Sequence, residues 1–108
     1  MLYEFRIYDT MPGRLPDLLA RFRNHTTKLF EKHGIKNVGY FTTAVGDYSE
    51  RLTYIIAFES MAHREKVWPA FANDPEWAKV KAESEKNGLL VRRVFNSFQT
   101  PTDFSPLQ

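Results

Sequence analysis

Arginine and tyrosine side chains on predicted β-strands are the groups in this sequence best suited to bind a ligand. Arg6 and Tyr8 alternate with apolar residues in the segment "YEFRIY" (3–8). An arginine binds a carboxylate through paired hydrogen bonds, and phenols between apolar side chains suit aromatic or polar groups. Three further segments of the same kind carry similar side chains. We therefore predict a cavity that binds a small aromatic or carboxylate-bearing molecule and is lined by Arg6, Tyr8, Tyr40, Thr42, Tyr54 and Arg92.

Glu4 and Arg6 also allow a second interpretation, in which they form a structural ion pair with a neighbouring strand, for example with Arg92. Buried structural ion pairs are common in proteins, so this interpretation is the simpler one. Replacing Arg6 with alanine distinguishes the two. Loss of ligand binding by a folded protein indicates a binding site, whereas unfolding indicates a structural ion pair.

Motifs for catalysis or metal binding are not visible in the sequence. The histidines His25, His33 and His63 have no Asp/Glu/His cluster at metal-ligand spacing around them, so we predict neither a metal site nor a cofactor. No P-loop and no nucleophile elbow occurs. A ligand-binding protein or an interaction module without catalysis is therefore favoured. The alternative is a cofactor-independent monooxygenase or isomerase that uses Glu4 or His25 as a base, and whether the chain is an enzyme stays open.

The composition indicates one globular domain with an excess of aromatic residues. The chain has 108 residues, no cysteine, a net charge of +2 and 15% aromatic residues. The lysines and arginines are interleaved with acidic residues, which argues against a nucleic-acid partner. No apolar run reaches the length of a membrane span, and the first residues lack a signal-peptide pattern. We therefore expect a cytoplasmic protein without disulfides.

Hydrophobic periodicity and turn residues predict the order β-α-β-β-α-β. The expected strands are 3–8, 35–45, 51–59 and 89–98, and the first helix, 15–33, ends at Gly34. Ser60 is the expected N-cap of the second helix, which should kink or end early at Pro69 and restart after Asp74. With right-handed crossovers this order gives an α+β, ferredoxin-like sandwich whose first and third strands are central. The domain then covers 1–98, followed by an extended C-terminal tail at 99–108.

The first predicted helix has one apolar face and one polar face. Leucines and phenylalanines recur at helical spacing from Leu15 to Phe30, and Trp68, Phe71 and Trp77 of the second helical region are expected core residues. The polar side of the first helix, expected to face away from the sheet, carries Arg14, Asp17, Arg21, Asn24 and Lys28.

Two helices cover only one face of a sheet, yet both faces of the predicted strands carry apolar side chains. An open apolar sheet face of that size exceeds what monomers normally tolerate, and pairing with a second copy buries it. We therefore predict a homodimer whose sheets face each other. We assign Tyr3, Phe5 and Ile7 to the helices, and Glu4, Arg6 and Tyr8 to the dimer interior.

Five short segments occur in a fixed order along the chain: "YEFRIY", Pro12-Gly13, "GYFTTAVGD" (39–47), "ESMAHRE" (59–65) and "NDPEW" (73–77). With these segments the chain resembles the NIPSNAP family from Tyr3 to about Phe98. The resemblance implies the dimeric α+β-barrel form of the ferredoxin-like fold, and no agreed enzymatic activity. Similar members often carry a glutamate where this chain has Ala44 and a tryptophan where it has Ile56. Both differences remove polar or ring groups from the expected cavity.

Overall fold

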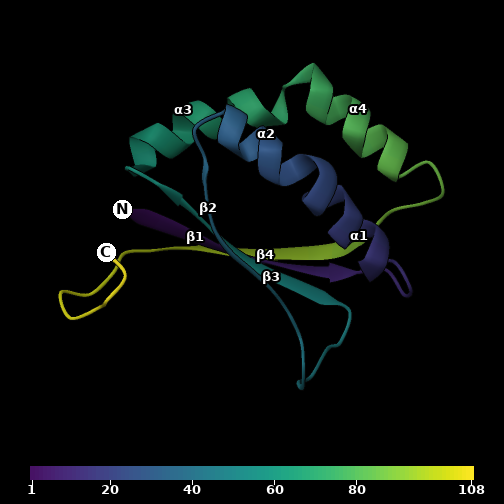
Figure 1. Cartoon of the computed structure of the whole chain (residues 1–108), viewed down its shortest axis with the longest axis horizontal. Helices are drawn as coiled ribbons and strands as arrows, with labels where there is room; N and C mark the ends of the chain where they lie inside the picture. Colours follow the sequence, from purple (N-terminus) through teal and green to yellow (C-terminus); the bar gives the residue numbers. More distant parts are fainter.

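A four-stranded antiparallel sheet with helices on one side forms the protein (Figure 1). The computed structural model describes all 108 residues. The strand order is β2-β3-β1-β4, so the first and third strands are central, as predicted. The elements are β1 (Leu2–Thr10), α1 (Leu15–Arg21), η1 (Phe22–Thr26), α2 (Thr27–Lys32), β2 (Lys36–Thr42), β3 (Arg51–Phe58), α3 (Met61–Ala72), α4 (Pro75–Ser84) and β4 (Val91–Gln99). None of the helices is long and apolar enough to cross a membrane.

The predicted helix caps are confirmed. Ser60 accepts a hydrogen bond from the backbone N–H of His63 at 3.1 Å, and Asp74 accepts one from the backbone N–H of Glu76 at 2.9 Å. Of the two outcomes expected at Pro69, a kink or an early end, the early end does not occur, because α3 continues to Ala72. Proline lacks the N–H of a regular helical turn, but its carbonyl still accepts the C-cap N–H at 2.9 Å.

A π-helical turn, η1, interrupts the first helical segment, which we expected to be one regular helix. The hydroxyl of Thr27 donates to the carbonyl of Phe22 at 3.0 Å, and that of Thr26 donates to the carbonyl of Arg21 at 3.4 Å. Each hydroxyl thereby reaches a carbonyl five residues earlier, which fits the wider π turn. Such turns inside α-helices frequently occur at functional sites.

The polar side chains of β1 face the helices, so the predicted orientation of this strand is wrong. The Arg6 guanidinium lies 4.6 Å from the ring centroid of Trp68 in α3, and the Tyr8 ring lies 5.9 Å from that of Phe22 in η1. Alternation defines two faces of a strand but does not say which one the helices cover. The residues on the helix-free side are instead Tyr3, Phe5 and Ile7.

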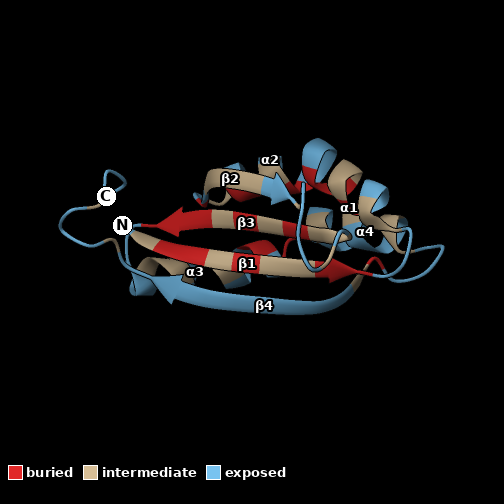
Figure 2. Cartoon of the chain, turned by 90° about the horizontal axis from the view of Figure 1, so that it is seen from below, coloured by how far each residue is buried: buried red, intermediate tan, exposed pale blue.

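The helix-free side of the sheet, named the open sheet face below, faces the viewer in Figure 2 and carries a group of apolar side chains. Phe41 of β2 and Phe95 of β4 are 56% and 46% exposed on it. At the far end of β1, Asp9 accepts hydrogen bonds from an arginine on each neighbouring strand. Besides Tyr3 and Ala57, which are buried, the apolar side chains of the open sheet face are Phe5, Ile7, Phe41, Ile55 and Phe95.

The core lies between the sheet and the helices and is dominated by stacked and tilted rings. Tyr54 is fully buried at its centre and contacts Phe22 and Phe30. Phe71 packs against Trp68 and Trp77, with ring centroids 5.3 and 5.0 Å away, so the predicted packing of these three residues is confirmed. The tail, 100–108, forms no helix or strand and leaves the sheet beside the N-terminus (Figure 1).

Candidate functional site

A cluster of polar side chains lies on the helix side of the sheet and consists of Glu4, Arg6, Tyr8 and Tyr54, the buried polar cluster. The Arg6 guanidinium donates to the Glu4 carboxylate at 2.6 Å, to the Tyr54 hydroxyl at 2.8 Å and to the Tyr8 hydroxyl at 3.2 Å. The Tyr54 hydroxyl donates to that of Tyr8 at 3.0 Å. Each of these four side chains therefore has a hydrogen-bond partner within the buried polar cluster.

The buried polar cluster is closed by its neighbours. Glu4 is fully buried and also accepts hydrogen bonds from Arg64 of α3 at 3.3 Å and from Asn96 of β4 at 3.1 Å. Burial opposes the charge of Arg6, but Tyr54, Tyr8 and Glu4 outweigh it and raise the pKa of Arg6. The arginine is therefore permanently charged, and each of its three guanidinium nitrogens donates a hydrogen bond.

Four of the six predicted site residues come together in the structure. Tyr40 stacks on Tyr54 with ring centroids 5.2 Å apart, and burial raises the pKa of the Tyr40 phenol. Arg6, Tyr8 and Tyr54 form the cluster described above. Thr42 and Arg92 are exposed and make no side-chain hydrogen bond to these residues. A ligand-binding role of all six residues stays a prediction.

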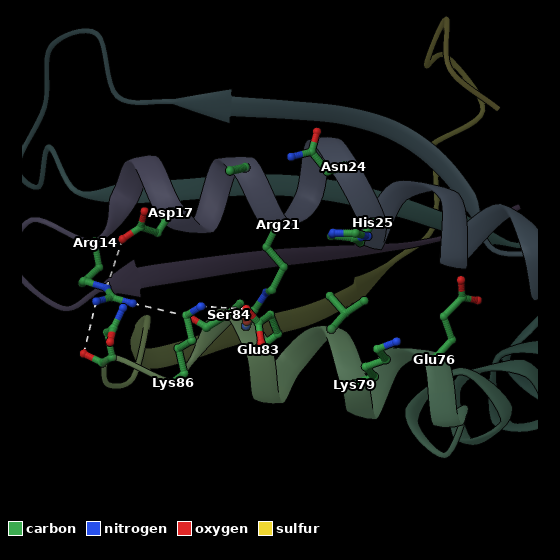
Figure 3. A pocket seen from close by; sticks show the side chains of 13 residues that line it. Arg14, Asp17, Arg21, Asn24, His25, Glu76, Lys79, Glu83, Ser84 and Lys86 are labelled. Carbon is green, nitrogen blue, oxygen red and sulfur yellow. Dashed lines mark hydrogen bonds and ion pairs between the residues drawn. The ribbon is translucent and has the colours of Figure 1, made fainter.

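A cleft of about 530 Å³ lies between two walls, and we call it the helix cleft (Figure 3). One wall is formed by α1 and η1, and the other by α4. Its volume falls in the range of small-molecule sites. Two segments more than fifty residues apart in the sequence form its walls. None of the six predicted site residues lines it. The lining residues used below are Ala20, Arg21, His25, Lys79, Val80 and Ser84.

Contacts at both ends hold α4 alongside the first helical segment. At one end, the Arg14 guanidinium donates to the carbonyl of Ser84, the last residue of α4, and to that of Asn87 just beyond it. A positive charge is favourable at this C-terminal end of a helix. At the other end, Asp74 at the start of α4 accepts a hydrogen bond from Lys32 at 2.8 Å. His33 Nε2 lies 2.7 Å from the same carboxylate. The two segments therefore run antiparallel, and side-chain contacts connect them at both ends of the cleft.

Arg21 lies in the middle of the helix cleft and is only 6% exposed. Its guanidinium donates to the Ser84 hydroxyl at 3.3 Å and lies 5.2 Å from the ring centroid of Trp77. Its Nε has no hydrogen-bond partner. Burial lowers the pKa of Arg21 below its usual value. The sequence places Arg21 on the polar side of the helix, and the structure adds that α4 covers this side and buries Arg21.

Sequence reasoning missed Arg21 as a candidate site residue, although a signal was present. Arg14, Arg21 and His25 are spaced by seven and four residues, which places them along one line of a helix. The sequence suggests His25 only as a possible base of the enzyme alternative. It is exposed and lines the cleft.

A family model described as NIPSNAP matches residues 3–106 of this chain. Protein NipSnap homolog 3B of Mus musculus is 35% identical over 75 residues, which cover 69% of this chain and 30% of that protein. Protein NipSnap homolog 3A of Homo sapiens is 31% identical over 77 residues, which cover 71% and 30%. The chain thus spans about 30% of the length of the curated relatives that it matches.

Solved structures agree with this match. A NIPSNAP family protein of unknown function from Agrobacterium tumefaciens is similar at a TM-score of 0.87 and 27% identity, covering 100% of this chain and 94% of that one. An antibiotic biosynthesis monooxygenase is similar at a TM-score of 0.58 and 11% identity, covering 94% and 99%. The second likeness shows a shared fold alone.

Proposed function

The chain belongs to the NIPSNAP family, and from this premise we propose that it is a homodimeric protein that binds a small molecule in the helix cleft. The observation that carries the proposal is the cleft itself, which is of ligand size and whose two walls are connected by side-chain contacts at both ends. The π-helical turn in one of its walls supports the same location, since such turns concentrate at functional sites.

The open sheet face supports the dimer. It carries a contiguous group of apolar side chains, of which Phe41 and Phe95 are about half exposed. Burial of apolar surface releases about 25 cal/mol per Å², and a standard interface buries roughly 1,600 Å². A second copy presenting the same face covers these side chains and leaves the helix cleft accessible on the outside of each protomer.

Binding without catalysis fits the buried groups better than the monooxygenase or isomerase alternative. A catalytic base needs an oxygen or nitrogen that is free to take a proton from the substrate. Glu4 already accepts hydrogen bonds from Arg6, Arg64 and Asn96. His25, the other suggested base, is exposed and has no carboxylate partner that would orient its ring.

Replacing Ala20 with tryptophan is expected to block the helix cleft and to remove the bound molecule. Ala20 lines the cleft from α1, and a bulky ring at this position occupies the space between the two walls. Native mass spectrometry of gently purified protein measures the effect as loss of a small-molecule adduct. Ala78→Trp is the matched control, because Ala78 is exposed on α4 outside the cleft. An adduct that survives Ala20→Trp, or disappears equally in both variants, contradicts this location.

A further inference from the structure

The Arg21 guanidinium in the helix cleft has no carboxylate in direct contact, and Glu85 acts on it only from a longer distance. No carboxylate oxygen lies within 4.0 Å of its guanidinium. A buried charge without a partner costs several kcal/mol, and the nearby Trp77 ring offsets only part of this cost. Arg6, which is similarly buried, has the Glu4 carboxylate at 2.6 Å. Arg21, unlike Arg6, therefore has no carboxylate in direct contact, and its Nε has no hydrogen-bond partner.

The carboxylates near the helix cleft are already engaged with other cations. Asp17 lies 3.4 Å from Arg14, and Glu83 lies 2.8 Å from Lys86. Glu85, which acts on Arg21 from a longer distance, lies 3.2 Å from the Lys81 ammonium. Lys79 lines the cleft without an ion pair. Arg21, which is buried, and Lys79 are therefore the two lining cations without an ion pair, and both can attract an anion from the solvent.

We propose that Arg21 binds the carboxylate of a small polar acid in the helix cleft, with Lys79 as a second positive group. The inference rests on the proposed function, since it names the ligand class of the same cleft. A guanidinium binds a carboxylate through two parallel hydrogen bonds. A single negative charge suits the cleft better than a phosphate dianion, because three carboxylates also line it: Asp17, Glu76 and Glu83. The body of the ligand is polar rather than aromatic, since only Ala20 and Val80 among the 13 lining residues are apolar.

Nuclear magnetic resonance tests the anchor without knowledge of the natural ligand. The ¹⁵N-labelled protein is titrated with sodium acetate and, at the same ionic strength, with acetamide, which has the same shape but no charge. We expect acetate to shift the Nε–Hε signal of Arg21 and the backbone signals of η1 and α4. Acetamide leaves these signals in place. Sodium phosphate, the dianionic probe, binds more weakly than acetate.

Variants of Arg21 give the second readout. Arg21→Met is expected to weaken acetate binding about tenfold or more, since a charged hydrogen-bond pair contributes roughly 1.5–3 kcal/mol. Arg21→Lys recovers part of the affinity. Arg23→Met is the matched control, because Arg23 is exposed on the same turn and does not line the cleft. If Arg21→Met does not fold, the contrast between acetate and acetamide on the unaltered protein decides the question.

Three results overturn the inference. These are equal shifts with acetate and acetamide, an unmoved Arg21 signal, or tighter binding of phosphate than of acetate. The proposed function fails separately, through an adduct that is insensitive to Ala20→Trp. A neutral adduct that Ala20→Trp displaces keeps the cleft as a binding site and overturns only the role of Arg21.

Discussion

Replacing Phe95 with aspartate is expected to convert the proposed dimer into monomers, while the same substitution at the adjacent Val94 leaves the dimer intact. Both residues are 46% exposed on the edge strand β4, so neither change removes a buried core side chain. They point to opposite sides of the sheet. Phe95 is paired with Ile7 on the open sheet face, and Val94 is paired with Tyr8 on the helix side. The pair of variants therefore tests one face of the sheet against the other.

The size of the Phe95→Asp effect follows from an unpaired charge in an apolar interface. Such a charge costs about 3 kcal/mol or more, and a symmetric dimer carries it twice. The dissociation constant should therefore rise by roughly ten-thousandfold or more. Sedimentation equilibrium over a range of protein concentrations measures it. If Phe95→Asp stays dimeric, or if Val94→Asp dissociates instead, the open sheet face is not the interface.

Replacing Arg6 with methionine is expected to lower the free energy of unfolding by about 3 kcal/mol. The substitution keeps the length of the side chain but leaves the fully buried Glu4 without its contact at 2.6 Å. Arg64 and Asn96 still donate to Glu4 and limit the loss. Urea unfolding of all variants at one protein concentration measures the effect, because the stability of a dimer depends on concentration.

Two further variants separate this structural role from a role in ligand binding. Arg92→Met is the control for removal of an arginine from a strand, since Arg92 is exposed and should change stability by less than about 0.5 kcal/mol. The double variant Glu4→Gln/Arg6→Met removes the buried negative charge as well and should be less destabilised than the sum of the single changes. If Arg6→Met unfolds like the unaltered protein but loses its bound molecule, Arg6 belongs to the binding site predicted from the sequence.

Local sequence signals predicted the order of the elements and several of their ends, although β2 (Lys36–Thr42) is shorter than the expected strand 35–45. Ser60 and Asp74 are short polar residues before helical segments, and each caps the helix that follows it. Gly34 ends the first helical segment at φ +78°, a backbone conformation that favours glycine. These features depend on a few neighbouring residues, which is why the sequence alone indicates them.

The orientation of β1 was not predictable by the same means. Its alternation gives one apolar face and one face with Glu4, Arg6 and Tyr8, and the usual rule turns the apolar face to the helices. The rule fails because Arg64 and Trp68 of α3 provide the partners that Glu4 and Arg6 need. The apolar row is left for the open sheet face. Long-range pairing therefore decided the orientation, and periodicity within one strand does not contain that information.

Arg21 and the helix cleft were missed for a related reason. A periodic pattern treats a helix as packed against one neighbour, and Arg21 lies outside the apolar stripe that meets the sheet. In the structure α4 lies alongside the same helix and buries Arg21 against Trp77 and Ser84. The π-helical turn was missed as well, because it depends on hydroxyls of Thr26 and Thr27 that reach carbonyls five residues back.

The central claim is that the protein is a homodimer that binds a small molecule in each helix cleft. The most direct test is the native mass of the gently purified, unaltered protein. We expect a species of twice the 12.7 kDa chain mass with two copies of one small adduct, which collisional activation releases as a carboxylic acid. A monomer without an adduct, observed even at high protein concentration, contradicts both the paired sheets and the occupied cleft.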